Sequence, residues 1–213
     1  MADLGKLHTA VLEGDAKTSA AITQQALDEG VEPLKLVTDS MVPAMDEAGR
    51  RFEAEEYFVP ELLLAARAMK AAMALIRPLL VASGAKSAGR VAVGTVKGDL
   101  HDIGKNLVAS MLEGGGFEVL DLGADVSPEK FIEAVKEKGA QVVCLSALLT
   151  VTMPAMKTTI EALKQAGVRE NVKVLVGGAP VTSQYASEIG ADGYGENANS
   201  AVALTRKLLA EGN

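Results

Sequence analysis

The chain has 213 residues, of which 48% are hydrophobic and 23% are charged, a composition typical of a soluble globular protein with one or two domains. Its formal net charge of −7, without a basic cluster, argues against nucleic acid as a partner. The single cysteine, Cys144, excludes an intramolecular disulfide and any metal site built from several cysteines, and only two histidines are present. We therefore expect any metal to arrive with a cofactor that supplies ligands of its own.

The first residues, Met-Ala-Asp-Leu-Gly-Lys, contain no basic, apolar signal region, so we expect a cytoplasmic protein. The richest apolar stretch, Leu62 to Ile76, is interrupted by Arg67 and Lys70 and is too short to span a bilayer. The sequence therefore predicts no membrane partner.

Apolar residues recur at helical spacing through about the first 85 residues, where no convincing strand is present. Gly14 and Gly30 separate the candidate helices as stop signals, and Pro33 suits a first helical turn. Pro43 falls inside the third of these helices and predicts a kink there. The three expected helices cover about 3–13, 16–29 and 33–51.

A seam of apolar residues, spaced alternately four and three apart, predicts a fourth helix. Pro78 should end or kink this helix. Four helices with short connections favour an antiparallel bundle, which we assign to a domain at residues 1–83. The seam consists of Leu62, Ala66, Met69, Met73, Ile76 and Leu80.

A small, polar segment at residues 84–89 is interpreted as a linker, with a hinge between Ser83 and Gly89. Beyond it, apolar runs typical of buried strands alternate with helical stretches. This alternation predicts an α/β domain at 90–213, with a doubly wound parallel sheet covered by helices on both faces. The expected strands are Val91–Thr95, Phe117–Leu122, Val142–Leu145, Val172–Val176 and a fifth near Asp192–Tyr194, and the expected helices cover about 105–114, 128–138, 154–166 and 182–189.

A histidine lies in a glycine-flanked loop directly after the first predicted strand, in the sequence Asp99-Leu-His101-Asp-Ile-Gly104. The carboxyl ends of strands are where open α/β sheets bind ligands. An imidazole there can ligate a metal, and a carboxylate two residues earlier can accept the proton on its other ring nitrogen, which fixes the tautomer. An isolated histidine is more often an ordinary loop residue, so the interpretation depends on features elsewhere in the sheet.

Hydroxyls and glycines follow two further predicted strands. Ser146, Thr150 and Thr152 come after the third strand, and Gly177 and Gly178 end the fourth. In a doubly wound sheet the ends of strands one, three and four can converge on one crevice. Hydroxyls there can donate to a polar tail, and glycines let a flat group approach the backbone.

The combination of Asp-x-His-x-x-Gly, Ser-x-Leu-x-Thr and Gly-Gly resembles the cobalamin-binding domain of B12-dependent methyltransferases. Residues Gly49–Phe52 and Tyr57–Leu62 are similar to the helical cap that precedes that domain, as in methionine synthase. The resemblance covers nearly the whole chain and is closest to the small corrinoid proteins of methylamine, methanol or methoxyaromatic methyltransferase systems. It implies a four-helix bundle cap followed by a Rossmann-like, flavodoxin-like sheet of five parallel strands.

The resemblance implies cobalamin as the cofactor, as methylcobalamin, cob(I)alamin or a related corrinoid. His101 would replace the cofactor's own base as the lower cobalt ligand, Asp99 would hydrogen-bond His101, and Thr152 would extend the relay. Phe52 and Val59 would cover the methyl face, with a place in the bundle core as the alternative for both. The remaining cofactor contacts implied are the tail contacts Ser146 and Thr150, the tunnel glycines Gly104, Gly177 and Gly178, and Gly98, Asp102, Ile103 and Leu148, of which Asp102 also fits a helix cap.

The implied function is that of a methyl carrier with little turnover of its own, so whether the chain counts as an enzyme stays open. A substrate-specific methyltransferase would load the cobalt, and a second methyltransferase would pass the methyl group to tetrahydrofolate or a thiol such as coenzyme M. A reductive activator would be a further partner. Two other functions remain open: a cobalamin-dependent sensor or regulator, and the small subunit of an adenosylcobalamin mutase.

Overall fold

The computed structural model describes residues 3–83 and 88–211, which fall into two compact units. The first unit covers residues 1–87 together with 113–116, and the second covers 88–112 and 117–213. Most of the predicted linker, at residues 84–87, lies outside the described residues, and so does the centre of the predicted hinge. None of the helices in the described part is long and apolar enough to cross a bilayer.

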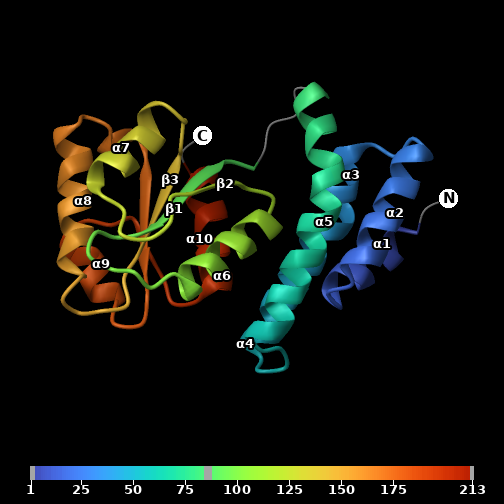
Figure 1. The fold of residues 1–213 in the computed structure, drawn as a ribbon, viewed down its shortest axis with the longest axis horizontal. Coiled ribbons are helices and arrows are strands. Elements are labelled where there is room, and N and C mark those ends of the chain that lie inside the picture. The colour runs from blue at the N-terminus through green and yellow to red at the C-terminus, as the bar shows by residue number, and fades with distance from the viewer. Residues whose placement is uncertain (1–2, 84–87, 212–213) are drawn as a thin grey trace. The chain divides into compact units, whose positions relative to one another are not determined.

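Helices build the first unit (Figure 1). The first two begin at aspartate caps: the carboxylates of Asp3 and Asp15 accept hydrogen bonds from backbone N–H groups of the first turn. The helices are α1 (Leu4–Leu12), α2 (Ala16–Asp28), α3 (Pro33–Leu36), the π-helix η1 (Val37–Met41), α4 (Val42–Glu53) and α5 (Val59–Ser83).

The two internal prolines have different effects on these helices. Ahead of Pro43 the helix predicted over 33–51 widens into η1, and α4 then begins with Pro43 in its first turn. The π turn accommodates a residue that has no N–H and whose ring clashes with the carbonyl four residues earlier. Pro78 does not end α5, which continues to Ser83. The proline removes only one backbone hydrogen bond from this helix of 25 residues.

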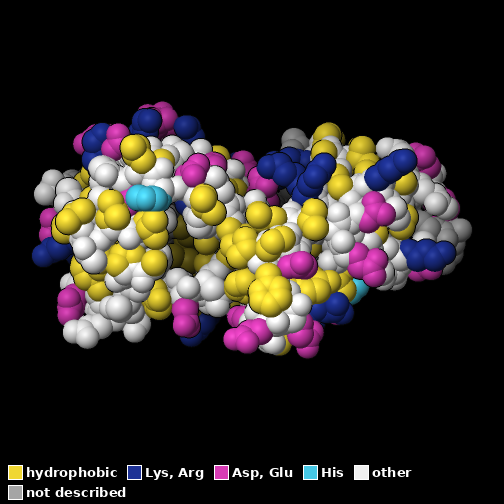
Figure 2. All heavy atoms as spheres, turned by 60° about the horizontal axis from the view of Figure 1, so that its bottom comes forward, with side chains coloured by type: hydrophobic (Ala, Val, Ile, Leu, Met, Phe, Trp, Pro, Cys, Tyr) yellow, Lys and Arg dark blue, Asp and Glu magenta, His cyan; other side chains and the backbone are white. Residues whose placement is uncertain are grey.

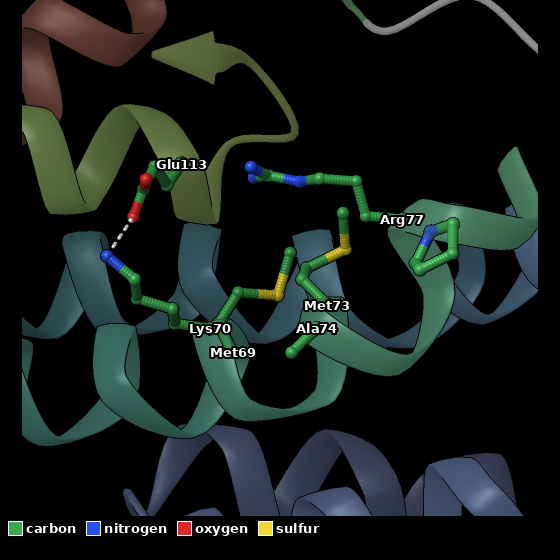
Figure 3. A pocket seen from close by; sticks show the side chains of 7 residues that line it. Met69, Lys70, Met73, Ala74, Arg77 and Glu113 are labelled. Carbon is green, nitrogen blue, oxygen red and sulfur yellow. Dashed lines mark ion pairs between the residues drawn. The ribbon is translucent and has the colours of Figure 1, made fainter. Parts of the chain in front are cut away.

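Apolar side chains of the predicted seam form the buried side of α5. Leu62, Met69 and Ile76 are fully buried, and Figure 3 shows Met69 and Met73 on successive turns of the helix. A Cβ on Gly14, whose φ is +77°, would lie 2.5 Å from the Leu64 Cβ, so only glycine permits this close packing of the α1–α2 turn against α5. Met41 and Met45 are buried as well, and the flexible side chain of methionine suits a core of irregular shape.

The second unit contains a five-stranded sheet in the order β2-β1-β3-β4-β5, with every pair parallel. This is the doubly wound order of flavodoxin-like folds, and it confirms the predicted α/β class. The register places Thr95 beside Ser146, Ser146 beside Gly177 and Gly177 beside Gly195, so these residues form one row at the carboxyl edge. The strands are β1 (Arg90–Thr95), β2 (Glu118–Asp121), β3 (Val142–Ser146), β4 (Lys173–Gly177) and β5 (Gly193–Gly195).

Helices cover both faces of the sheet, with α6 and α10 on one face and α7, α8 and α9 on the other (Figure 1). The ring of Phe131 lies fully buried under the second of these layers. The sequence pattern did not predict α10, which begins with a capping box between Asn197 and Ser200. The helices are α6 (Ile103–Gly114), α7 (Pro128–Lys136), α8 (Pro154–Gln165), the 3-10 helix η2 (Arg169–Asn171), α9 (Ser183–Ile189) and α10 (Ala198–Ala210).

Candidate functional site

A tight turn follows β1 and sets the direction of Asp99. The Asp99 N–H donates to the Val96 carbonyl at 3.1 Å, and Gly98 adopts a φ of +84° at the third position of the turn. Glycine takes that left-handed conformation without steric cost. On the other side of the loop, the buried Thr95 hydroxyl donates to the His101 carbonyl at 2.8 Å. The loop that carries the histidine is therefore fixed at both ends.

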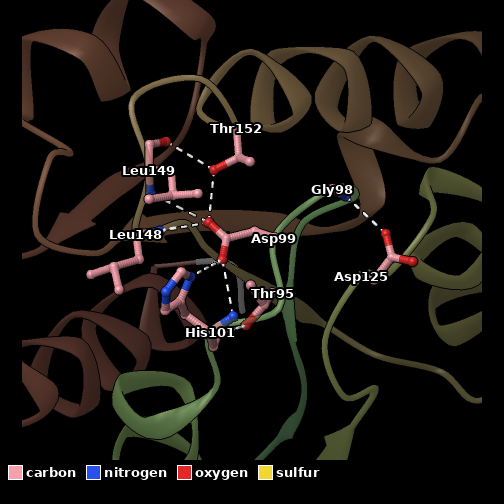
Figure 4. A network of polar contacts seen from close by, with 8 residues as sticks. All are labelled: Thr95, Gly98, Asp99, His101, Asp125, Leu148, Leu149 and Thr152. Atoms are coloured by element: carbon pink, nitrogen blue, oxygen red, sulfur yellow. Dashed lines mark hydrogen bonds and ion pairs between the residues drawn. The ribbon is translucent and has the colours of Figure 1, made fainter.

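Asp99 holds the imidazole of His101 in one orientation (Figure 4). Its Oδ1 accepts from the His101 backbone N–H at 3.0 Å and lies 2.8 Å from the ring Nδ1. The Asp99 side chain is fully buried, whereas that of His101 is 50% exposed. An ionised carboxylate can only accept, so the ring proton is assigned to Nδ1, and Nε2 of the neutral ring keeps its lone pair.

The second carboxylate oxygen of Asp99 is held by the loop after β3. Oδ2 accepts from the Leu148 N–H at 2.8 Å and from the Thr152 hydroxyl at 2.7 Å, with the Leu149 N–H farther away at 3.4 Å. Burial by itself raises the pKa of the Asp99 carboxyl, but hydrogen bonds from Thr152, Leu148 and His101 outweigh it and hold the pKa well below its usual range. Asp99 is therefore ionised at neutral pH.

The Thr152 hydroxyl has one proton and two acceptors. Its Oγ1 lies 2.7 Å from Asp99 Oδ2 and 2.8 Å from the Leu149 carbonyl. While Asp99 is ionised, the proton can satisfy only one of these oxygens at a time. If Asp99 took up a proton, it could donate to Thr152, which could then donate to Leu149. The structure thus brings Asp99, His101 and Thr152 together in a chain that has hydrogen bonds available in both protonation states.

Exposed apolar side chains lie close in sequence to His101 and Thr152, in the loop after β1 with the start of α6 and in the loop after β3. Sequence reasoning selected Ile103 and Leu148 but missed the other three, whose only signal is their place beside the motif. Figure 2 shows hydrophobic side chains gathered in groups on this view of the surface. A group of neighbouring exposed apolar side chains often marks a binding surface, whereas single ones scattered over a surface are ordinary. The exposed fractions are 77% for Leu100, 82% for Ile103, 43% for Leu148, 41% for Leu149 and 80% for Val151.

Other predicted residues of the His loop have separate surroundings. Gly104 lies in the first turn of α6, and a Cβ there would meet nothing within 4 Å, so space beside it is open. Asp102 lies directly before α6; its carbonyl accepts from the Asn106 N–H at 2.7 Å, and its carboxylate accepts from the Asn106 side-chain amide at 3.1 Å. This geometry fits the helix-cap interpretation of Asp102.

The predicted tail-binding positions lie along the ends of β3 and β4. Ser146 is half-buried at the end of β3, and Thr150 is exposed in the loop that follows. A Cβ on Gly178 would lie 2.0 Å from the Ala147 carbonyl oxygen, and one on Gly177 would lie 2.8 Å from that of Gly195. Close approach of the protein's own backbone therefore already requires these glycines, whatever ligand lies nearby.

Two of the predicted residues belong to the first unit. Phe52 is half-buried on α4, and Val59 is exposed at the start of α5, both in the first unit. Cys144 lies buried inside β3, where burial raises the pKa of its thiol to about 12 and disfavours the reactive thiolate.

The donor set suits a metal that is already held by a macrocycle. Among residues 3–83 and 88–211, no three His, Cys, Asp or Glu side chains gather closely enough to hold a metal ion. What the site offers is one oriented imidazole with an apolar rim. A flat, largely apolar ligand that carries its own equatorial metal ligands fits these residues, since it needs one axial nitrogen and apolar contacts.

Models of the B12 binding domain match residues 89–203 and, in a second form, residues 4–77. The chain belongs to the B12-binding corrinoid proteins. The trimethylamine corrinoid protein 2 of Methanosarcina mazei is 45% identical over 211 residues, which cover 98% of this chain and 97% of that protein. The dimethylamine corrinoid protein of Methanosarcina barkeri is 44% identical over 209 residues, covering 97% of each chain.

Solved structures agree with this assignment of the corrinoid protein. A chain of the methanol:cobalamin methyltransferase complex from Methanosarcina barkeri matches with a TM-score of 0.85 and 30% identity, covering 97% of this chain and 79% of that one. A cobalamin-binding protein from Desulfitobacterium hafniense matches with a TM-score of 0.79 and 32% identity, covering 97% and 98%. The family and its corrinoid cofactor are therefore those that the resemblance implied.

Proposed function

We propose that this corrinoid protein is a methyl carrier in which His101 Nε2 is the lower ligand to cobalt, in place of the cofactor's own base. The observation that carries the proposal is the bond of His101 Nδ1 to the buried Asp99 carboxylate, at 2.8 Å. That bond fixes the tautomer in which Nε2 can ligate a metal and increases the basicity of the ring.

The residues around His101 have distinct roles in this proposal. The exposed rim, with Ile103 and Leu148, would contact the apolar macrocycle, and the open space beside Gly104 would leave room for it. Ser146 and Thr150 would contact the displaced nucleotide tail. Gly98 orients the loop, Gly177 and Gly178 shape the floor beside the tail, and Phe52 and Val59 of the first unit would protect the methyl face.

Bound at this site, the corrinoid supplies a cobalt centre that accepts and releases a methyl group. The chain's own residues control the proton on the imidazole. While His101 ligates, Nε2 carries no proton and Nδ1–H is donated to Asp99. If His101 were released, Nε2 would be free to accept a proton, and Asp99, still ionised and still accepting from Thr152, would hold the ring through Nδ1.

A carrier needs enzymes on both sides of the transfer. We propose a substrate-specific methyltransferase that loads it, a second methyltransferase that unloads it to tetrahydrofolate or a thiol such as coenzyme M, and a reductive activator, all in the cytoplasm. The names of the relatives support this proposal. Two are corrinoid proteins named for trimethylamine and dimethylamine, and one solved relative is part of a methanol:cobalamin methyltransferase complex.

The test is the absorption spectrum of the chain reconstituted with hydroxocobalamin, beside His101→Ala. His8→Ala is the matched control, because His8 is the other histidine of the chain and lies on α1. We expect a histidine-ligated spectrum in wild type and His8→Ala, and its loss in His101→Ala. An unchanged spectrum in His101→Ala would refute the assigned ligand. Tighter binding of adenosylcobalamin than of methylcobalamin, without methyl transfer, would favour a sensor or mutase subunit.

A further inference from the structure

The loop between β2 and α7 contains an aspartate in an unusual backbone conformation. Asp125 has a φ of +53°, and Glu55 is the other non-glycine residue of the described chain with a positive φ. Asp tolerates this left-handed region better than most side chains, although at a cost in energy. A conformation of this kind persists where surrounding contacts hold it in place.

Backbone hydrogen bonds tie this loop to the end of β1. The Val126 N–H donates to the Thr95 carbonyl at 2.9 Å, and the Thr95 N–H donates to the Gly123 carbonyl at 3.0 Å. Val96 and Val126 continue the parallel pairing as an isolated bridge. The loop therefore has a fixed position beside the turn that precedes His101.

Asp125 contacts this turn through its carboxylate and through its backbone N–H, and Figure 4 shows the contact of the carboxylate with Gly98. Its Oδ1 accepts from the Gly98 N–H at 2.8 Å, and its own N–H donates to the Asp99 carbonyl at 2.9 Å. Its Oδ2 lies 2.9 Å from the Lys97 ammonium, in an ion pair between side chains that are 40% and 60% exposed. With its backbone in the left-handed conformation, Asp125 forms hydrogen bonds to the Gly98–Asp99 turn through both its N–H and its carboxylate.

These contacts complete the support of Asp99. The loop after β3 holds its carboxylate through Leu148 and Thr152, and the loop after β2 holds its backbone through Asp125. If the Gly98–Asp99 peptide rotated, Oδ1 would move away from the His101 ring. The orientation of the imidazole therefore depends on a residue that does not touch it.

We infer that Asp125 is a positioning residue for the cobalt ligand, acting through the Gly98–Asp99 turn on His101. This inference rests on the proposed function, in which His101 ligates cobalt. The hydrogen bond to Gly98 is the element that matters, and the exposed ion pair with Lys97 is dispensable, since exposed pairs contribute little.

Three variants separate these contributions. Asp125→Gly keeps the freedom to adopt a positive φ but removes the acceptor for Gly98. Asp125→Asn keeps an acceptor oxygen and tolerance of the left-handed region but removes the charge. Lys97→Ala removes the ion pair alone. Asp125→Glu keeps the charge but displaces the carboxylate by one methylene, and it serves as a second disruptive variant should Asp125→Gly fold poorly.

The measurement is the electron paramagnetic resonance spectrum of the protein loaded with cob(II)alamin, followed against pH. A coordinated nitrogen splits the cobalt signal, and the part of the splitting that His101→Ala abolishes reports the fraction of protein with His101 bound. Protonation releases the ligand, so weaker positioning raises the pH midpoint of release. We expect Asp125→Gly and Asp125→Glu to raise this midpoint by about one pH unit, a tenfold loss that matches one hydrogen bond to a charged acceptor. Asp125→Asn and Lys97→Ala should stay within about 0.3 unit of wild type.

A double-mutant cycle shows whether Asp125 acts through His101. In a His101→Ala background, Asp125→Gly should change the affinity for cobalamin by less than about twofold, because the coupled partner is already absent. The inference would be overturned if Asp125→Gly kept the wild-type midpoint, or if Asp125→Gly lowered the affinity for cobalamin equally with and without His101. Either result would leave the proposed function standing. If wild type itself shows no nitrogen splitting that His101→Ala abolishes, the proposed function fails, and this inference fails with it.

Discussion

The hydroxyl of Thr152 offers the sharpest test of the Asp99 network. Thr152→Val keeps the β-branched shape of this buried residue and removes the donor that lies 2.7 Å from Asp99 Oδ2. A hydrogen bond to a charged group contributes roughly 1.5–3 kcal/mol, so we expect the free energy of unfolding to fall by about 2 kcal/mol at pH 7. For a chain of this size that corresponds to roughly 4–8 °C in melting temperature. Thr152→Ser keeps the hydroxyl and is the matched control.

The pH dependence of this loss follows from the direction of the pKa shift. The pKa of Asp99 is lowered in the folded state, so the stability it contributes is present above the unfolded value of about 4 and is lost as pH falls toward the folded one. Removing the Thr152 donor moves the folded pKa back toward the unfolded value. The difference between Thr152→Val and wild type should therefore be complete at pH 7 and smaller near pH 2.5.

Thermal and urea unfolding of the apoprotein, monitored by circular dichroism at several pH values, measure both effects. The reasoning is refuted if Thr152→Val and Thr152→Ser unfold within about 0.5 kcal/mol of each other at pH 7, the range of an ordinary surface substitution. A loss that stays constant down to pH 2.5 would show that packing, and not the hydrogen bond to Asp99, explains the destabilisation.

Three further predictions concern two glycines and the cysteine. Gly178→Ala should destabilise the protein in urea unfolding by about 3 kcal/mol or more, since its φ is +125° and the new Cβ would lie 2.0 Å from the Ala147 carbonyl oxygen. Gly104→Ala, in open space on α6, should leave the free energy of unfolding unchanged or higher and should weaken cobalamin binding, measured by titration. Equal destabilisation by Gly178→Ala and Gly104→Ala would contradict the view that only Gly178 is required by close packing. Cys144 should resist iodoacetamide at pH 8 in the native protein, because burial raises the pKa of its thiol to about 12. It should react once the protein is unfolded in urea. Rapid labelling of the native protein would contradict this prediction and show that β3 opens.

The architecture of the second unit was largely predictable because its sequence signals are local. Buried parallel strands are short apolar runs, such as Val142–Ser146, and the helices between them have their own caps and periodicity. The helix α10 was missed because its buried face consists of small or weakly apolar residues, Ala198, Ala201 and Val202 among them. Its capping box at Asn197 and Ser200 was the available signal.

The effect of the two helical prolines could not be predicted fully from the neighbouring sequence. The sequence placed a disturbance at Pro43 but could not specify a π turn, which depends on how the surrounding helices pack. Pro78 was expected to end or kink α5, and the helix does not end there but continues to Ser83. Whether a helix survives the loss of one hydrogen bond is decided by the whole helix and not by the residue alone.

The sequence by itself determined the ingredients of the site: a histidine two residues after an aspartate, in a loop at the end of a strand. The local pattern of residues did not show which other groups reach that aspartate: the family resemblance implied Thr152, and only the tertiary structure added Asp125. Thr152 is 53 residues away from Asp99, and Asp125 lies on a different loop again. The physical reason is the strand order, because β1 lies between β2 and β3, so that the loops after both neighbours flank the loop that carries His101. Contacts of that range follow from which strands pair, and no local pattern in the chain encodes them.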